Sequence, residues 1–319
     1  LAAYHKGRHL LAEHDYDVIY SSGGAWSAHQ AAAMSRRKTG VTWIAEIHDP
    51  MVIRDDPTDD GRRPRASRKD RFLQQVERTI CSEADHIWWF TEDALNYAKL
   101  RNPKLEDKGF VVLPGAEPPV CHHYHEYSDT LNLCHFGSLT NDRSLAPVLN
   151  SLETFFVNHP KAKNVIRIHT YGSDIDEAAK AVLEQLKLPE IIVNHGRLES
   201  DPLTGKSGRE RVIEKMYEAD VLLLLHGDYE WCAEYIPSKL YEYFWAQRPV
   251  VAVTNRNRFL DELLLKHNSY VCHTHDKASI LQTFENLWRD WQRSSLKAFE
   301  GEPVSVNDAV SQILTRVEH

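Results

Sequence analysis

The sequence predicts an α/β protein built from two doubly wound parallel sheets. The first observation is that short apolar segments alternate with helical patterns from DVIYSS at residues 17–22 onward, which is typical of βαβ units. The second is that four predicted strands after residue 130 end at Gly137, Gly172, Gly196 and His226. The third is the length of 319 residues, which accommodates two domains of ordinary size.

The first half of the chain contains a βαβ unit with a glycine turn. Ligands of parallel sheets lie at the carboxyl ends of strands, where Gly23, Gly24 and His48 fall. Position alone is equally compatible with a His48 that is hydrogen-bonded to a loop carbonyl. The predicted strands of this half are residues 17–22, 41–47, 86–90 and 110–113, and its predicted helices are residues 25–37, 70–83 and 92–100, the last capped by Thr91.

Residues 55–71 lose this periodicity and concentrate charge. A surface loop is the favoured interpretation; the alternative is contact with anionic lipid headgroups or with an acceptor phosphate. The cations concerned are Arg62, Arg63, Arg65, Arg68, Lys69 and Arg71.

Residues 116–130 have no periodicity and indicate an interdomain linker. Zinc sites usually draw on two separated ligand pairs, and no partner pair stands out for the cysteine and histidines here, so no metal site is predicted. The predicted domains are residues 1–120 and 131–295, joined by a linker at 121–130, with a terminal segment at 296–319 that packs back on the first domain. The linker side chains in question are Cys121, His122, His123 and His125.

The βα alternation resumes at residue 131. Neither a GxGxxG fingerprint nor a GxxxxGK[ST] loop is present, which weighs against a dehydrogenase and a P-loop enzyme. The predicted strands are residues 131–137, 165–171, 191–194, 220–225, 250–253 and 270–272, and the predicted helices are residues 144–156, 176–186, 209–218, 261–267, a long helix from 277, and 306–317.

The segment EYIPSKLYEYFWAQRPVVAV at residues 234–253 has the clearest local pattern. Pro237 suits the first turn of a helix, and Ser238 is expected to cap its exposed amides. Pro249 is expected to stop the helix, and residues 250–253 form a buried strand.

The chemistry of this segment indicates an anion and a polyol. Exposed amides at a helix start bind phosphate, and Lys239 adds a cation there. Glu234 and Glu242 suggest polyol recognition on one side and reaction-centre chemistry on the other. The alternative is a buried amphipathic helix with a solvated acidic face.

Composition restricts the class of protein. The chain is 42% hydrophobic and 26% charged, with mean hydropathy −0.49, and its net charge of −8 argues against nucleic acid as a general partner. Five scattered cysteines without a CxxC pair favour reduced thiols and a cytoplasmic setting. No signal peptide or membrane span is visible. The chain begins with Leu1 inside a predicted helix, so an N-terminal part is expected to be missing.

Three features together resemble the GT-B glycosyltransferases of the family 4 type. They are two Rossmann-like halves, the HDP strand end at residues 48–50, and two glutamates separated by seven residues before PVVAV. The resemblance covers nearly the whole chain, and the opening strands of the first domain that are usual in the family are not in view. It implies two Rossmann-like domains facing a cleft, the first binding the acceptor and the second binding the nucleotide-sugar donor.

The resemblance also implies residue roles. Glu242 would hold the ribose of the donor, Glu234 would contact the donor sugar and stabilise positive charge at its anomeric carbon, and His48 would lie near the transferred sugar. Gly23 and Gly24 would lie on the acceptor side. Further donor-binding residues would be Ile236, Pro237 and Ser238 through their amides, with Lys239, Arg143, Gly137, Ser138, Tyr171, Gly172, Gly196 and Arg197.

The expected function is therefore that of a retaining, metal-independent glycosyltransferase without a cofactor, because the nucleotide sugar is itself a substrate. It would act on a lipid-linked or polysaccharide acceptor in the cytoplasm, with peripheral contact to the inner membrane face through residues 62–71. The alternatives are a GT-B sugar-nucleotide epimerase and a non-catalytic binding or scaffold protein.

Overall fold

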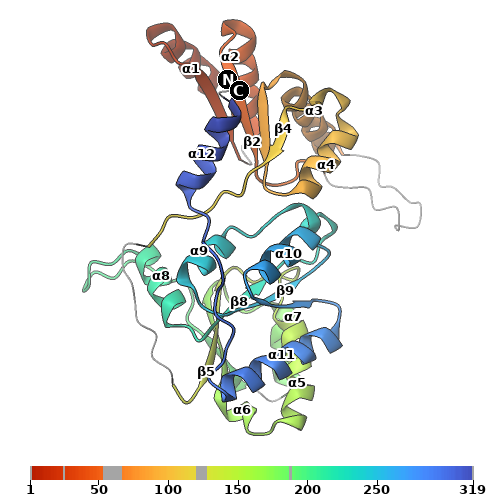
Figure 1. The fold of residues 1–319 in the computed structure, drawn as a ribbon, viewed down its shortest axis with the longest axis vertical. Coiled ribbons are helices and arrows are strands. Elements are labelled where there is room, and N and C mark those ends of the chain that lie inside the picture. The colour runs from red at the N-terminus through yellow and green to blue at the C-terminus, as the bar shows by residue number, and fades with distance from the viewer. Residues whose placement is uncertain (1, 24–25, 53–66, 120–127, 187–188, 318–319) are drawn as a thin grey trace. The chain divides into compact units, whose positions relative to one another are not determined.

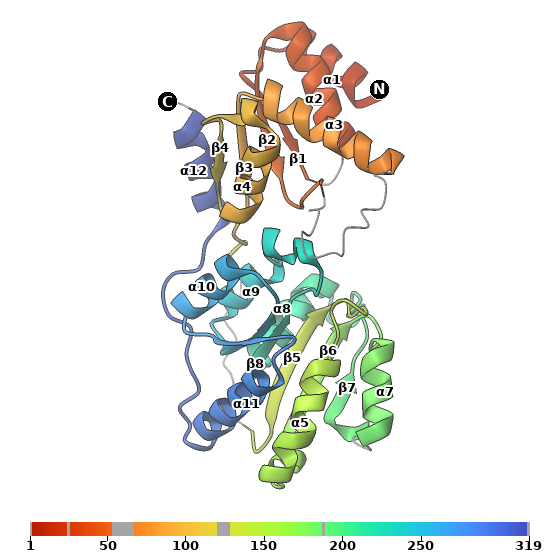
Figure 2. The same cartoon turned by 90° about the vertical axis from the view of Figure 1, so that its right-hand side faces the viewer.

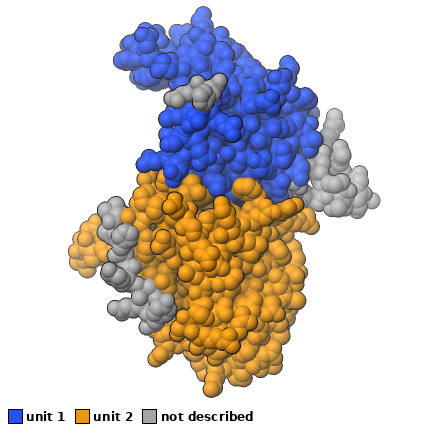
Figure 3. Space-filling model, in the orientation of Figure 1, with its two compact units in different colours: residues 1–114, 233–236, 307–319 blue, residues 115–232, 237–306 orange. Residues whose placement is uncertain are grey.

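The computed structural model describes residues 2–23, 26–52, 67–119, 128–186 and 189–317. Two compact units make up the chain (Figure 3). Unit 1 contains Leu1–Pro114, Ala233–Ile236 and Asn307–His319, and unit 2 contains Gly115–Cys232 and Pro237–Val306. The short segment Ala233–Ile236 thus groups with unit 1, although its neighbours on both sides belong to unit 2.

Unit 1 is built on a parallel sheet in the order β1-β2-β3-β4. Alternate side chains of the central strands point to opposite faces. Trp43 and Ile87 pack with α2, α3 and α4, while Ile44 and Trp88 pack against Ile313 of α12, which runs beside the sheet (Figure 1). The elements are α1 (Ala2–Glu13), β1 (Val18–Ser22), α2 (Trp26–Thr39), β2 (Thr42–Ile47), α3 (Arg68–Glu83), β3 (His86–Trp89), α4 (Glu92–Arg101), η1 (Pro103–Leu105), β4 (Gly109–Val111) and α12 (Val306–Val317).

Unit 2 contains a parallel sheet in the order β10-β9-β8-β5-β6-β7. Its first strand, β5, lies in the middle, so the strand order reverses between β5 and β8, as in doubly wound nucleotide-binding sheets. The strands are β5 (Leu131–Gly137), β6 (Ile166–Gly172), β7 (Ile192–Asn194), β8 (Val221–Leu225), β9 (Val250–Thr254) and β10 (Tyr270–His273).

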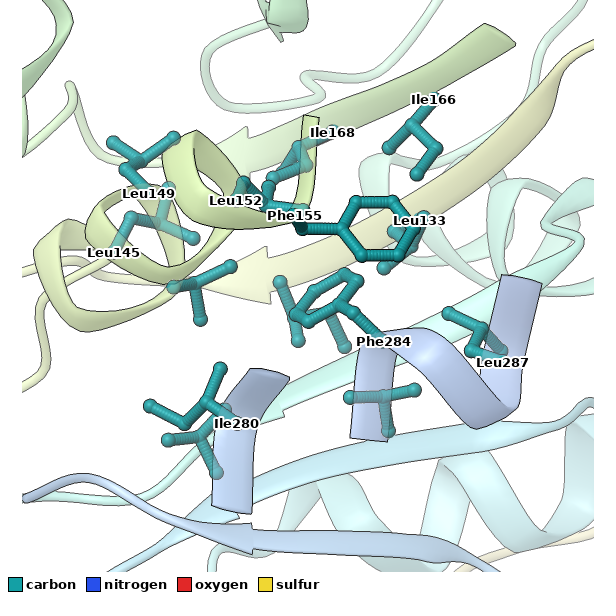
Figure 4. Packing of buried hydrophobic residues seen from close by; sticks show 14 of the residues in the cluster. Leu133, Leu145, Leu149, Leu152, Phe155, Ile166, Ile168, Ile280, Phe284 and Leu287 are labelled. Carbon is teal, nitrogen blue, oxygen red and sulfur yellow. The ribbon is translucent and has the colours of Figure 1, made fainter. Parts of the chain in front are cut away.

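Helices cover the sheet of unit 2 on both faces (Figure 2). On one face, α5 and α11 bury Phe155 and Phe284 against Leu133 and Ile168 of the strands (Figure 4). The two phenylalanine rings lie 6.2 Å apart between their centroids. The helical elements are α5 (Ala146–Asn158), α6 (Ala162–Val165), α7 (Glu177–Leu186), η2 (Pro189–Ile191), α8 (Gly208–Glu218), η3 (Glu230–Glu234), α9 (Lys239–Ala246), α10 (Arg258–Lys266) and α11 (Lys277–Gln292).

Two local predictions about helix starts are wrong. Ser238 has helical dihedrals (φ −56°, ψ −32°) and makes no side-chain cap hydrogen bond, because the chain already turns at Pro237, whose carbonyl accepts the amide of Leu240 at 2.9 Å. The loop predicted at residues 55–71 extends too far, because α3 already starts at Arg68, where Ser67 and Asp70 form a capping box. Residues 53–66 lie outside the described part of the chain.

One other local prediction is confirmed. Thr91 caps α4 by accepting the amide of Ala94 at 3.1 Å. None of the helices in the described residues is long and apolar enough to cross a membrane.

Candidate functional site

A cavity of about 800 Å³ opens in unit 2, at the carboxyl ends of β5 and β6. The loop after β7 and the first turns of α8 and α9 complete its walls. Because the strands are parallel, their carboxyl ends meet at one edge of the sheet, and this edge is where doubly wound folds bind ligands. The predicted donor-site residues that line the cavity are Gly137, Ser138, Tyr171, Gly172, Arg197, Lys239 and Glu242.

Two glycines shape the floor of the cavity. Gly137 and Gly172 have φ of +117° and +149°, a region that L side chains rarely adopt. A Cβ on Gly172 would lie 2.3 Å from the carbonyl oxygen of Gly137, and a Cβ on Gly137 would lie 2.6 Å from Nζ of Lys239. A side chain at either position would therefore clash, on Gly172 with the backbone of β5 and on Gly137 with the ammonium of Lys239.

Lys239 lies at this floor, and the charge of Arg143, a predicted donor-site residue that does not itself line the cavity, acts on it. The ammonium of Lys239 donates a hydrogen bond to the carbonyl of Phe136, and burial, followed by the positive charge of Arg143, lowers the pKa of Lys239 to about 7. Nε of Arg143 is buried and has no hydrogen-bond partner within the described residues. A pair of partly desolvated cations of this kind favours an anion as ligand.

Glu242 also lines the cavity, together with a residue that the sequence did not indicate. Its Oε1 lies 2.5 Å from Nη1 of Arg209, and both residues line the cavity. Arg209 stands in the first turn of α8, behind the capping box of Ser207 and Glu210. The capping box was available as a sequence signal for the helix start, but nothing in the sequence relates that start to Glu242.

Aromatic rings stack beside the cavity across β5, β6 and the end of β7. Phe136 and Tyr171 are 4.8 Å apart between ring centroids with 8° between their planes, and Tyr171 and His195 are 4.5 Å apart with 6°. Gly196 supports the same edge, because its carbonyl accepts the amide of Gly172 at 2.9 Å. Gly196 itself is not among the residues that line the cavity.

Other predicted donor-site residues lie elsewhere. Glu234 and Ile236 belong to the segment that groups with unit 1. Glu234 is only 1% exposed, and its main-chain carbonyl accepts a hydrogen bond from Thr91 Oγ1 at 3.0 Å. Pro237 and Ser238 belong to unit 2 but do not line the cavity.

Unit 1 contains a second polar cluster, at the carboxyl ends of β1 and β2. Nε2 of His48 contacts Oε1 of Glu46, a carboxylate rather than a loop carbonyl. The imidazole stacks on Phe90 with 4.9 Å between ring centroids. Gly23, with φ +81°, lies beside the ring of His48, so the structure brings these two predicted residues together. Gly24 lies outside the described residues.

No group of three or more His, Cys, Asp or Glu side chains among the described residues is arranged to hold a metal ion. The side chains considered for zinc, Cys121, His122, His123 and His125, lie outside the described ranges. Of the basic segment, Arg68, Lys69 and Arg71 belong to α3, and the ammonium of Lys69 lies 5.4 Å from the ring centroid of Trp26.

Residues 1–105 match the family model described as glycosyl transferase 4-like domain. No curated protein matches the chain by sequence.

Solved structures resemble nearly the whole chain. HepE of Anabaena in complex with UDP has a TM-score of 0.65 at 12% identity, with 98% of this chain and 77% of that chain covered. The structure of TarM has a TM-score of 0.62 at 11% identity, with 91% and 52% covered. An α,α-trehalose-phosphate synthase (UDP-forming) from Burkholderia vietnamiensis has a TM-score of 0.60 at 11% identity, with 89% and 70% covered. At these identities the likeness establishes the fold, and the predicted pair of Rossmann-like domains is confirmed.

Proposed function

We propose that the protein is a glycosyltransferase that takes a sugar from a nucleoside-diphosphate donor bound in unit 2, since residues 1–105 match the model of a glycosyl transferase 4-like domain and the fold is that of the similar structures. The observation that carries the proposal is the cavity of unit 2, where two glycines without room for a side chain lie in the lining with Lys239, whose pKa is lowered by burial and by the charge of Arg143. Two similar structures, of HepE from Anabaena, contain UDP and UDP-glucose.

Each part of the donor has a chemical counterpart in the cavity. The diphosphate lies over Gly137 and Gly172, where Lys239 and Arg143 neutralise its charge. The ribose hydroxyls donate to the carboxylate of Glu242, with Arg209 beside it. The base lies toward Tyr171 and Arg197.

The same groups support the proposed chemistry. Departure of the nucleoside diphosphate develops negative charge on the phosphate and positive charge at the anomeric carbon. Cations that are already in place stabilise the leaving group without reorganisation, which is the basis for proposing transfer without a metal ion. Retention of configuration, with the departing phosphate taking the proton of the acceptor hydroxyl, completes the proposal.

We assign the catalytic roles to Glu234 and His48. Glu234 stabilises positive charge at the anomeric carbon, and His48 binds a hydroxyl of the transferred sugar. A buried carboxylate suits the first role, because a charge that is shielded from water acts more strongly on a nearby cation. We expect removal of the Glu234 or the His48 side chain to abolish turnover.

The acceptor is a polysaccharide or a lipid-linked glycan of the cell envelope, and the protein works in the cytoplasm with peripheral contact to the inner membrane face. The support for membrane contact is the run of cations between Arg62 and Arg71. Charge reversal in this run should lower binding to vesicles that contain anionic lipid, and unchanged binding would refute the contact.

Donor binding is the first prediction to test. A thermal-shift panel of UDP-, GDP-, ADP- and CMP-sugars should identify one base that raises the melting temperature, because a ligand at about 100 times its Kd adds about 2.7 kcal/mol to the free energy of unfolding. Glu242→Ala should remove most of this shift, since it removes the acceptor for the ribose hydroxyls.

The matched control is Glu218→Ala. Glu218 is an exposed carboxylate of α8 that pairs with Lys215 and does not line the cavity, so its removal should leave the nucleotide-induced shift unchanged. If no nucleotide sugar stabilises the unmodified protein at millimolar concentration, donor binding in unit 2 is refuted.

A further inference from the structure

The carboxylate of Glu46 lies at the centre of the polar cluster in unit 1. Its Oε2 accepts a hydrogen bond from the hydroxyl of Tyr20. Its Oε1 accepts one from Oγ of Ser22 at 3.3 Å and contacts Nε2 of His48. Glu46 is 9% exposed, whereas 38% of the His48 side chain is exposed. The His48 side chain is therefore partly exposed, whereas its Nε2 contacts a carboxylate that is buried.

One nitrogen of the His48 imidazole, Nδ1, faces the backbone of Gly23, which carries no side chain. One face of the ring stacks on Phe90, and Nδ1 of His48 lies 3.6 Å from the position that a Cβ on Gly23 would occupy. The turn at Gly23 is held from two sides, because its amide donates to the carbonyl of Glu46 at 3.2 Å and its carbonyl is 3.1 Å from Nε2 of His29.

An ionised carboxylate can only accept hydrogen bonds, so its contact with Nε2 of His48 favours the ring form that carries the proton on that nitrogen. In the neutral ring the other nitrogen then carries a lone pair. We propose that Glu46 is a positioning residue that fixes His48 in the Nε2–H form, so that Nδ1 accepts a hydrogen bond from a hydroxyl of the sugar substrate. The identity of the hydroxyl donor rests on the proposed function, whereas the proton position does not.

Tyr20 shows why a carboxylate is needed at this position. The indole N–H of Trp88 donates to the Tyr20 oxygen at 3.1 Å, so the Tyr20 proton is left for Glu46. Burial, and then the bond to Glu46, raises the pKa of Tyr20, which keeps the phenol a donor. Glu46 thus accepts from Tyr20 at one oxygen and from Ser22 at the other, where Nε2 of His48 also makes contact. A glutamine would offer one oxygen and one NH₂ group, and either Tyr20 or His48 would then face a second donor.

The test is the position of the proton on His48. Long-range ¹H–¹⁵N NMR of protein labelled with ¹⁵N-histidine distinguishes the two tautomers, and His48→Gln identifies the signals of this ring. The unmodified protein should show the Nε2–H form. Glu46→Gln should introduce the Nδ1–H form, while Ser22→Ala, which removes only the 3.3 Å bond, should keep the Nε2–H form.

Kinetics supply the second measurement. With UDP-glucose as the probe, Glu46→Gln should lower kcat by about 10- to 100-fold, which corresponds to one charge-assisted hydrogen bond, with KM within about twofold. An Nδ1–H ring in the unmodified protein would overturn the inference, even if Glu46→Gln does not fold. So would a Glu46→Gln variant with unchanged tautomer and kcat. If no nucleotide sugar is turned over, the proposed function fails, and the tautomer still decides the role of Glu46.

Discussion

At the scale of single residues, Lys239 is expected to favour binding of the donor and to disfavour the folded state. Its ammonium is partly buried beside Arg143, and both effects lower its pKa to about 7. A cation held in this way disfavours the folded state, and a bound diphosphate would remove the disadvantage. Binding sites commonly carry such a cost in stability.

The variant Lys239→Met should therefore be more stable than the unmodified protein and poorer at binding the donor. We expect a gain of about 1 kcal/mol in the free energy of unfolding at pH 7 and at least a tenfold loss of nucleotide affinity. Because the folded pKa of Lys239 lies below its unfolded value, the unfolded state binds more protons between pH 7 and pH 10, so this residue makes stability rise with pH in that window.

Urea titrations at pH 7 and pH 9 measure both effects, since the variant should lack the part of the rise that Lys239 contributes. Lys215→Met is the control, because Lys215 is a half-exposed cation of α8 that pairs with Glu218 and does not line the cavity. A Lys239→Met protein that is less stable and binds nucleotide normally would contradict the assignment of Lys239 to the donor site.

At the scale of elements, the site depends on strand ends that come close together. The carboxyl ends of β5 and β6 touch through Gly137 and Gly172, and both glycines have backbone dihedrals that disfavour a side chain. Steric contact with a backbone atom cannot be relieved by rotating a side chain, so the two strands would have to separate to admit a Cβ.

Gly172→Ala should consequently lower the free energy of unfolding by about 3 kcal/mol or more, through clash and strained backbone together. It should also weaken nucleotide binding, because the floor of the cavity moves. Gly205→Ala separates the two causes. Gly205 also has a positive φ, of +71°, but nothing within 4 Å of its added Cβ, and its substitution should cost about 1 kcal/mol. Equal losses in the two variants, measured by urea unfolding, would refute the steric argument.

At the scale of the whole molecule, both units bury neutral histidines. Burial lowers the pKa of His29 in unit 1 and of His135 in unit 2, and burial followed by the neighbouring His195 lowers the pKa of His169 in unit 2 to about 4. In the unfolded chain these rings take up protons near pH 6.5. Below that pH the unfolded state binds more protons than the folded state, so stability falls as the pH falls.

We expect the free energy of unfolding to drop by about 1–3 kcal/mol between pH 7.5 and pH 5. His169→Gln should reduce the drop, because it removes one of the three groups. His9→Gln should leave it unchanged, since His9 is an exposed residue of α1, with 62% of its side chain accessible. Chemical unfolding across this range makes the comparison. A stability that is independent of pH between 7.5 and 5 would show that the buried histidines do not control acid unfolding.

The sequence by itself predicted most elements of this protein and part of the lining of the cavity proposed as the donor site. Helices and strands follow from short-range periodicity, and capping residues such as Thr91 act on amides within one turn. Strand-end glycines and the Lys239–Glu242 helix were identified for the same reason, because each is a local pattern followed by a known placement at the edge of a parallel sheet.

Only the tertiary structure decided which side chains meet across the fold. Arg209 reaches Glu242 from a different helix, and the carbonyl of Glu234 accepts a hydrogen bond from Thr91, 143 residues earlier in the chain. Glu46 and His48 are neighbours in sequence, but the Tyr20 and Trp88 that complete their cluster come from β1 and β3. Such contacts depend on the pairing of strands and the packing of helices over long separations, and local sequence patterns carry no record of them.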